Sequence, residues 1–457
     1  MEQFKKAMNE NAAMRWGVLI LVGFVLSVNY YFYDAFSTLK DLLRAEFDFT
    51  NSQYGLFISF YSIPNTFLLM AVLGGIILDK FGIRRTGFGF IFFMALGAVL
   101  TAYGASDYYS NGGFGYDAFN SFLPQYSAQL KMMLVGRFFF GLGAETSIVV
   151  VSKILVKWFK GKNLALAFGL KVGFGRLGTF AALNLSPIIA KEDGSNLSGA
   201  IWLAAILVCT GLLAFIVYML IDTKLDKQLE ANKNPDAIEE KEKPFSISDI
   251  GKLLGNRAYL YIALLCVTFY SAVFPFLAYV PDFFSDKFGM SSIESGKLTS
   301  LLPLGTLFFT PFFGWLIDRK GRSATAMIFG AITLLIVHLT FAFTYLTPAV
   351  PTILLGIAFS LVPAAMWPSM VKLVDERQIG TAYGLMYSIQ NLGLFAFPLL
   401  AGAILDYTNP GNPEVANYTP TVLMFAGVSL LGLLFAILLK VEDKKRAYGV
   451  ELPLNKK

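Results

Sequence analysis

Two side chains of opposite charge lie deep inside apolar stretches of this sequence, where ionisable groups are rare. Glu145 falls within the apolar run 131–157 and Arg176 within the run 163–190. An ionisable residue at the centre of a membrane span costs about 2.5–3.5 kcal/mol on insertion scales, so such residues face a cavity, pair with one another or carry function. The two residues predict either a shared ligand site or a buried ion pair that locks two helices together.

Both residues are expected at the same depth. The runs that carry them are joined only by residues 160–163, so two helices there would be antiparallel neighbours. Counted from that joint, each residue is about twelve to thirteen positions into its helix, which corresponds to roughly 18–20 Å at 1.5 Å per residue. The side chains can therefore meet or flank one ligand. A buried ion pair is weak evidence for added stability, which favours the ligand site.

Other polar residues in apolar runs are candidates for the same site. Tyr33 and Asp34 end the aromatic cluster 30–34, which fits either an outer gate or an interfacial aromatic belt. Lys153 and Lys171 predict a positively lined inner vestibule, with snorkelling of long side chains as the alternative. Five further residues predict a cavity wall or interhelical hydrogen bonds: Tyr270, Trp367, Tyr387, Gln390 and Asn391.

The only histidine, His338, is about fifteen residues into another apolar run. A lone histidine on an apolar helix is more often a packing residue, and a proton-coupling role for it is the alternative. The sequence has no phosphate-binding loop, no metal-ligand spacing and no nucleophile motif. It therefore predicts no enzyme, no cofactor and no bound metal, and its basic residues do not follow one face as in a nucleic-acid-binding protein.

The elements that must position these residues are membrane-spanning helices. Of the 457 residues, 56% are hydrophobic and 15% are charged, against about 45–50% and about 25% in soluble domains. Runs of about twenty apolar residues each span a bilayer. The sequence predicts an all-α membrane protein with twelve such runs: 15–36, 52–78, 86–106, 131–157, 163–190, 199–221, 258–281, 292–317, 323–347, 350–374, 380–405 and 420–440.

The charged residues between the runs predict the domain division and the orientation. Residues 222–257 are polar and separate a six-helix bundle at 1–221 from another at 258–457, with a short amphipathic helix expected near 245–254. With the N-terminus inside, the inner segments carry 26 Lys and Arg and the outer segments carry 6. Because positive residues stay on the cytoplasmic side, both termini are predicted to be cytoplasmic.

An internal repeat links the two halves. Residues 75–85 are echoed by 314–322, each after the second run of its half, and both share a Gly-x-x-x-Asp frame. A repeat that keeps its orientation predicts two bundles related by a pseudo-two-fold axis along the membrane normal. The duplicated turns predict gating residues, with a simple positive-inside turn as the alternative: Asp79, Arg84, Arg85, Asp318, Arg319 and Arg322.

Several motifs along nearly the whole chain resemble those of one family. They are residues 33–34, 136–145, 158–162, 168–170, 176–178, 367–368, 380–384 and 388–394. In these motifs the sequence is similar to the major facilitator superfamily, and within it to the lysosomal dipeptide uniporter subfamily and its bacterial relatives. The resemblance implies alternating access by facilitated diffusion, with Glu145 holding the amino end and Arg176 the carboxyl end of a dipeptide.

The same resemblance leaves alternatives open. Lys153 and Lys171 replace uncharged polar residues of the lysosomal members, so a proton-coupled or exchange carrier for small organic anions is one alternative, and a substrate sensor without transport is another. Proton coupling would require Glu145, Asp34 or His338 to gain or lose a proton when the substrate binds. The expected location is a bacterial cytoplasmic membrane, or else the lysosomal membrane. The expected partners are the lipid bilayer and a small solute. The protein is expected to be a monomer, with association with an accessory subunit as the alternative.

Overall fold

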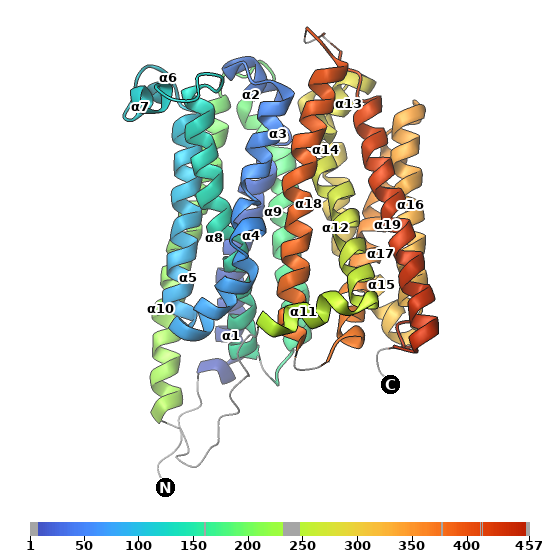
Figure 1. Ribbon diagram of the computed structural model, residues 1–457. Helices are drawn as coiled ribbons and strands as arrows, with labels where there is room; N and C mark the ends of the chain where they lie inside the picture. Colours follow the sequence, from blue (N-terminus) through green and yellow to red (C-terminus); the bar gives the residue numbers. More distant parts are fainter. Residues whose placement is uncertain are drawn as a thin grey trace.

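The structure is a computed structural model, and it describes residues 8–159, 161–231, 247–375, 378–411, 413 and 415–453. Within these ranges every regular element is a helix (Figure 1). The first half of the chain forms η1 (Met8–Glu10), α1 (Ala12–Ala35), α2 (Lys40–Phe47), α3 (Asn51–Phe60), α4 (Ile63–Phe67), α5 (Met70–Gly104), α6 (Asp107–Ser110), α7 (Tyr116–Asn120), α8 (Ala128–Phe159), α9 (Leu164–Ala190) and α10 (Leu197–Ala231). The second half forms α11 (Ile247–Gly255), α12 (Arg257–Leu277), α13 (Val280–Phe288), α14 (Ser292–Thr299), α15 (Leu301–Lys320), α16 (Ser323–Phe343), α17 (Ala349–Leu373), α18 (Ile379–Thr408) and α19 (Thr419–Arg446). The predicted all-α membrane fold is confirmed.

Among the described residues, eleven helical segments are long and apolar enough to cross a membrane. The predicted span 52–78 is not one of them, because the chain there is divided among α3, α4 and the beginning of α5. Pro64 falls in the first turn of α4, where its missing N–H is tolerated. This second crossing is therefore discontinuous.

The helix α5 contains the end of that crossing and the whole of the next one. Gly82 interrupts it with φ 77° and ψ 170°, a conformation that glycine adopts readily. A methyl group on Gly74 would lie 2.7 Å from Thr146, and one on Gly143 would lie 2.1 Å from the carbonyl of Phe90. Residues 143 and 146 are about one turn apart on α8, so their contacts Phe90 and Gly74 lie at nearly the same depth along that helix. The chain between residues 74 and 90 therefore reverses its direction at Gly82. Counting this reversal, the described chain crosses twelve times.

The two halves of the chain lie side by side. In Figure 1, α5, α8 and α10 form one side of the molecule, and α12, α16 and α19 form the other. The helix α10 continues to Ala231, beyond the predicted boundary at residue 221, and residues 232–246 lie outside the described part of the chain. The predicted short helix near 245–254 is present as α11. We call α1–α10 the N-terminal half and α12–α19 the C-terminal half.

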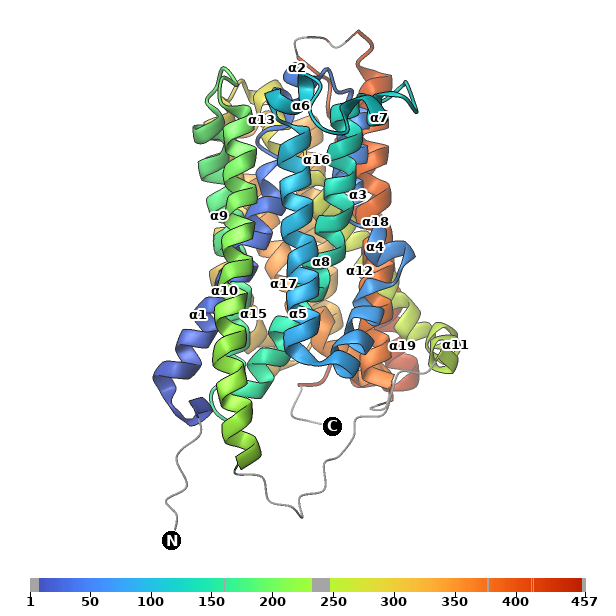
Figure 2. The same cartoon turned by 90° about the vertical axis from the view of Figure 1, so that its left-hand side faces the viewer.

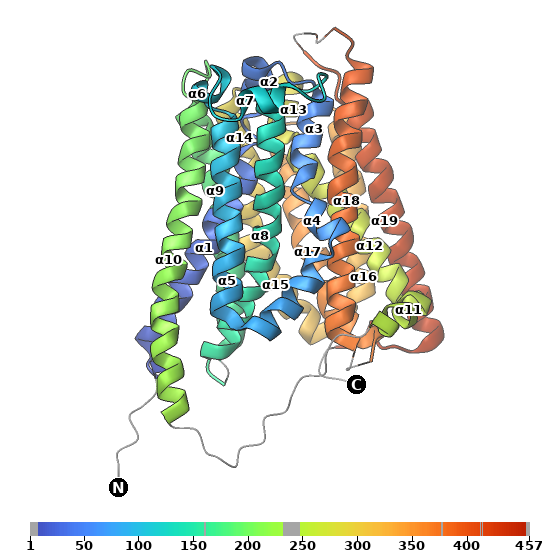
Figure 3. The same ribbon diagram turned by 60° about the vertical axis from the view of Figure 1, so that its left-hand side comes forward.

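The two ends of the helix array differ in what covers them. In all three views α2, α6, α7 and α13 lie at one end, and α11 lies at the other (Figures 1, 2 and 3). The first is the end predicted to face outward, and we call it the outer end; the opposite one is the inner end. The long outer loop 107–129 contains α6 and α7, and its residue Tyr109 is fully buried.

Glycine contacts hold the helices that carry Glu145 and Arg176 against their neighbours. A methyl group on Gly141 of α8 would lie 2.0 Å from the carbonyl of Tyr61, and one on Gly178 of α9 would lie 2.0 Å from the carbonyl of Ser27 in α1. Neither backbone carbonyl can move aside cheaply. Small residues are thus required beside both candidate site residues, as in other close helix crossings in membranes.

Candidate functional site

A large cavity runs from the middle of the protein to the inner end. Its volume is about 1850 Å³, and Asp79, Lys252 and Asp375 line its inner part. Residues of both halves form the wall. Nine of the predicted site and gating residues line it: Tyr33, Asp79, Glu145, Lys171, Arg176, Tyr270, Trp367, Tyr387 and Gln390.

Glu145 and Arg176 line this cavity but do not bond to each other. The Oε1 atom of Glu145 accepts a hydrogen bond of 2.7 Å from the Tyr61 hydroxyl. The Arg176 guanidinium lies 5.0 Å from the ring centre of Phe359 and 5.9 Å from that of Tyr30. Among the described residues no ion pair joins Glu145 to Arg176, so the alternative of a buried ion pair that locks the two helices is not formed in this structure.

One wall of the cavity is aromatic and comes from the C-terminal half. The Trp367 indole N–H donates to the Tyr270 hydroxyl at 2.9 Å, and its ring stacks on Tyr387 with centroids 4.6 Å apart. The adjacent polar residues of α18 separate: Gln390 lines the cavity and accepts from the Cys266 thiol at 3.7 Å, whereas Asn391 is buried and donates to the Tyr387 carbonyl at 3.0 Å. Stacked and edge-on ring pairs such as Trp367 with Tyr387 and Tyr270 with Trp367 are each worth about 0.5–1.5 kcal/mol beyond the area that they bury.

Asp34 lies outside the main cavity, toward the outer end. It accepts a hydrogen bond of 2.6 Å from the Thr179 hydroxyl and lines a separate cavity of about 30 Å³ together with Tyr33 and Arg137. Arg137 is fully buried among aromatic rings, the nearest being Phe57 at 5.0 Å. Sequence reasoning overlooked Arg137 as a functional candidate, although a charged residue within an apolar run is the same signal that selects Glu145.

The two lysines of the predicted inner vestibule have different surroundings. Lys153 forms an ion pair with Asp79 and is not among the residues that line the cavity. Lys171 lines the cavity, and its ammonium donates to the Ser152 hydroxyl at 2.6 Å and to the Ile148 carbonyl at 3.2 Å. The positive charge of Lys153 is therefore neutralised, whereas Lys171 bonds only to neutral acceptors.

The predicted gating residues lie in the inner turns. Asp79 pairs with Lys153, and the guanidinium of Arg84 lies 3.1 Å from a carboxylate oxygen of Asp226. In the C-terminal half the Arg319 guanidinium lies 5.0 Å from the ring centre of Trp315, and the backbone N–H of Arg322 donates to the Glu451 carbonyl at 2.8 Å. Arg85 and Asp318 are exposed. Each of these contacts stays within one half, and gating by the duplicated turns stays a prediction.

His338 lies away from the main cavity, inside the C-terminal half. It is fully buried against the ring of Phe276, with centroids 5.0 Å apart. Its Nδ1 atom is 3.0 Å from the Ser429 hydroxyl, which donates its own proton to the Phe425 carbonyl at 2.9 Å. Nδ1 must therefore carry the proton of this bond. This placement supports the packing role rather than the proton-coupling role.

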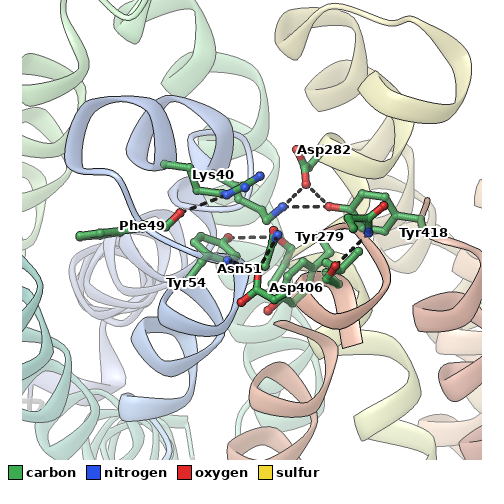
Figure 4. Close-up of polar contacts among 12 residues, drawn as sticks. Lys40, Phe49, Asn51, Tyr54, Tyr279, Asp282, Asp406 and Tyr418 are labelled. Carbon is green, nitrogen blue, oxygen red and sulfur yellow. Dashed lines mark hydrogen bonds and ion pairs between the residues drawn. The ribbon is translucent and has the colours of Figure 1, made fainter. Parts of the chain in front are cut away.

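The outer end is closed by charged residues from both halves (Figure 4). The ammonium of Lys40 pairs with the carboxylate of Asp282, which lies 242 residues further along the chain, and donates to the Tyr418 hydroxyl at 2.9 Å. The Tyr418 hydroxyl donates to the same carboxylate. Lys40 is 1% exposed and Asp282 is 4% exposed, so this ion pair is shielded from water.

A second contact across the halves lies beside it. The carboxylate of Asp406 accepts from the backbone N–H groups of Asn51 at 2.9 Å and Ser52 at 2.8 Å, so it caps the first turn of α3. A negative charge at a helix N-terminus is stabilised by free N–H groups and by the helix dipole. We call Lys40, Asp282, Tyr418, Asn51 and Asp406 the outer lock. The structure is thus closed at the outer end and open at the inner end.

The outer lock is expected to close more tightly as the outer pH falls from 7 to 5. Burial and the negative charge of Asp282 raise the pKa of the neighbouring Asp286 to about 6, with Lys40 and Arg44 opposing the shift. In a water-exposed open state its pKa would be about 3.9. The closed state therefore binds this proton more tightly, and titration of Asp286 alone should lower the ratio of open to closed molecules about tenfold over this interval.

This pH effect can be measured from the distance between spin labels at the exposed residues Glu46 of α2 and Lys297 of α14, after both native cysteines are replaced by alanine. The Asp286→Asn variant should lose this tenfold part of the response and keep the part due to Asp41, whose pKa burial and the negative charge of Asp282 raise to about 9. An equal pH response in that variant would assign the effect to another group.

Comparison with known proteins places this architecture. The profile of the Major Facilitator Superfamily matches residues 19–397 and 276–453. The chain belongs to this superfamily. As a member of the major facilitator superfamily it is a multi-pass membrane transporter, and the expected major facilitator fold of two helical bundles is confirmed.

Its relatives include transporters with different named substrates. The "Lysosomal dipeptide transporter MFSD1" of Danio rerio is 30% identical over 444 residues, which cover 95% of this chain and 88% of that protein. The Mus musculus protein of the same name is 31% identical over 406 residues, with coverages of 86% and 81%. The "Hexuronate transporter" of Bacillus subtilis is 22% identical over 399 residues, with coverages of 83% and 86%.

Solved structures of the superfamily share the fold. The crystal structure of the D-xylose-proton symporter superposes with a TM-score of 0.69 at 13% identity, over 93% of this chain and 97% of that chain. That of the nucleoside transporter NupG superposes with a TM-score of 0.63 at 14% identity, over 93% and 98%. At these identities the likeness concerns the fold alone.

Proposed function

We propose that this transporter carries dipeptides or similar short zwitterions by facilitated diffusion, with the two halves alternating access to one central site. The observation that carries the proposal is that Glu145 and Arg176 line one cavity on adjacent helices without pairing with each other. The carboxylate suits the ammonium end of a zwitterion, and the planar guanidinium suits its carboxylate end. The MFSD1 relatives, named as dipeptide transporters, support this assignment.

The shape of the molecule supports alternating access. The cavity reaches the inner end, which we propose to be cytoplasmic, and the outer lock closes the opposite end with contacts that join the two halves. Breaking these contacts while closing the inner turns would expose the same site outward. His338 lies outside the cavity, so the only histidine gives no support to proton-coupled transport.

A second candidate substrate class is small organic anions. Arg176 and Lys171 both line the cavity, and the Bacillus subtilis relative is named as a hexuronate transporter. An organic anion would use the two cations and leave Glu145 without a positively charged partner, which is unfavourable for a carboxylate inside a membrane protein. We therefore place the zwitterion first.

Thermal stability of the purified protein with different ligands tests the proposal, because a ligand that binds the folded state raises the melting temperature. The ligands are alanyl-alanine, its N-acetylated form, its C-terminal amide, alanine, and a hexuronate. We expect alanyl-alanine to raise the melting temperature and both blocked forms to be weaker, since each lacks one of the two charges. A rise with the hexuronate alone would support the organic-anion carrier, and equal effects of free and blocked peptides would refute the zwitterion site.

A further inference from the structure

Lys171 is a charged group of the cavity that the ends of a zwitterion do not use. Its two hydrogen-bond partners, the Ser152 hydroxyl and the Ile148 carbonyl, are both neutral. None of the residues that the structure describes forms an ion pair with it. A cation that has left bulk water without a counter-charge is unfavourable, so a negatively charged ligand group near it would gain a charge-assisted hydrogen bond.

The position of Lys171 relative to the proposed site follows from two helices. On α9 it comes five residues before Arg176, which places it about 7.5 Å nearer the inner end. On α8 its partners Ile148 and Ser152 come three and seven residues after Glu145, which is one to two turns toward the same end. The ammonium therefore lies below the two residues that would hold the peptide ends, on the wall of the same cavity.

The charges of the cavity do not cancel at this level. Asp79 is neutralised by Lys153, and Lys252 and Asp375 lie at the inner mouth. Glu145, Arg176 and Lys171 remain around the middle of the cavity, with two positive charges and one negative charge. A dipeptide with an uncharged side chain balances only Glu145 and Arg176, whereas one with a carboxylate side chain also balances Lys171.

We propose that Lys171 is a specificity-determining residue that binds the side-chain carboxylate of a peptide, so that the transporter prefers dipeptides containing aspartate or glutamate. This inference rests on the proposed dipeptide function. It assigns a third anchoring point to the site, on the inner side of Glu145 and Arg176. The inner part of the cavity is continuous with that site, so the side chain can extend there without a rearrangement of the helices.

The experiment compares peptides that differ in one charge at nearly constant shape. Binding of alanyl-glutamate and alanyl-glutamine, and of the two peptides with reversed order, is measured by calorimetry on the full chain. Wild type should bind the better glutamate peptide about tenfold or more tightly than its glutamine partner, as expected for one hydrogen bond between charged groups. The Lys171→Met variant should lose this ratio and keep its affinity for the glutamine peptides within about threefold.

Lys372→Met is the matched control, because Lys372 also donates only to neutral acceptors, the carbonyls of Gly449 and Leu452, and does not line the cavity. It should keep the preference of wild type. A ratio near one in wild type, or an unchanged ratio in Lys171→Met, would refute the role of Lys171 while leaving the dipeptide site intact. Failure of all four peptides to bind would instead refute the proposed function.

Discussion

Replacing Lys40 with methionine should open the outer end of the transporter. The ammonium of Lys40 is the buried partner of Asp282, and its loss leaves a carboxylate uncompensated at an interface between the two halves. Removing one partner of a buried ion pair costs about 3–5 kcal/mol. Because the cost falls on the closed state, the ratio of outward-open to outward-closed molecules should rise by a factor of about a hundred or more.

The distance between spin labels at Glu46 and Lys297 measures this ratio in the same cysteine-free background. The matched control is Lys287→Met, which also removes a lysine of the outer end. Lys287 donates to the carbonyls of Phe341 and Ala342, which belong to its own C-terminal half, so these hydrogen bonds do not connect the two halves. We expect a long-distance population in Lys40→Met and the wild-type distribution in Lys287→Met.

A double variant separates a broken lock from general damage. Lys40→Met combined with Asp282→Leu removes both charges, and apolar residues of similar volume in place of a buried ion pair are often neutral or stabilising. The double variant should therefore return toward the closed distance. An unchanged distance in Lys40→Met, at an unchanged melting temperature, would show that the ion pair does not hold the outer end closed.

Arg176→Ala and Glu145→Gln should each weaken dipeptide binding by roughly tenfold to a hundredfold, the expected loss of a hydrogen bond between charged groups. Neither substitution is expected to unfold the protein. The Arg176 guanidinium forms no hydrogen bond with a described residue, so alanine there leaves no protein acceptor unpaired. Glutamine at position 145 can still accept the hydrogen bond that the Tyr61 hydroxyl donates.

Blocked peptides show which end each residue holds. The C-terminal amide of alanyl-alanine should bind wild type weakly and lose little further in Arg176→Ala, because the missing charge is the one that Arg176 recognises. The N-acetylated peptide should behave likewise with Glu145→Gln. Additive losses for both combinations in calorimetric titrations would mean that the two residues act at a distance from the ligand.

Much of the fold could be predicted from the sequence, because a bilayer permits few solutions. Every backbone polar group in the hydrocarbon must be satisfied within its own segment, so an apolar run of about twenty residues becomes a helix. The rise of 1.5 Å per residue then placed Glu145 and Arg176 at one depth without any tertiary information. The length of the joint at residues 160–163 made their helices neighbours, and both residues line the same cavity.

Only the tertiary structure decided how the charges are matched. The sequence treats Lys153 and Lys171 alike, yet one pairs with Asp79 and the other faces the cavity. Lys40 and Asp282 lie in separate outer segments, 242 residues apart, and no local feature of the sequence indicates that they form an ion pair. The depth of a residue in the membrane follows from its position along its helix, which the sequence gives directly. The pairing of two charges depends instead on the rotation of each helix about its axis and on the packing of one half against the other.

The same distinction applies to the discontinuous second crossing and to His338. Hydropathy detects an apolar run in 52–78 but not the breaks among α3, α4 and α5, because apolar composition does not specify backbone angles. It places His338 within a span but not on a face, and the structure turns that face away from the cavity. The sequence by itself therefore determined which segments cross the membrane and how deep the charges lie. The tertiary structure alone decided which charges meet and which face the substrate path, because these depend on contacts between residues far apart in the chain.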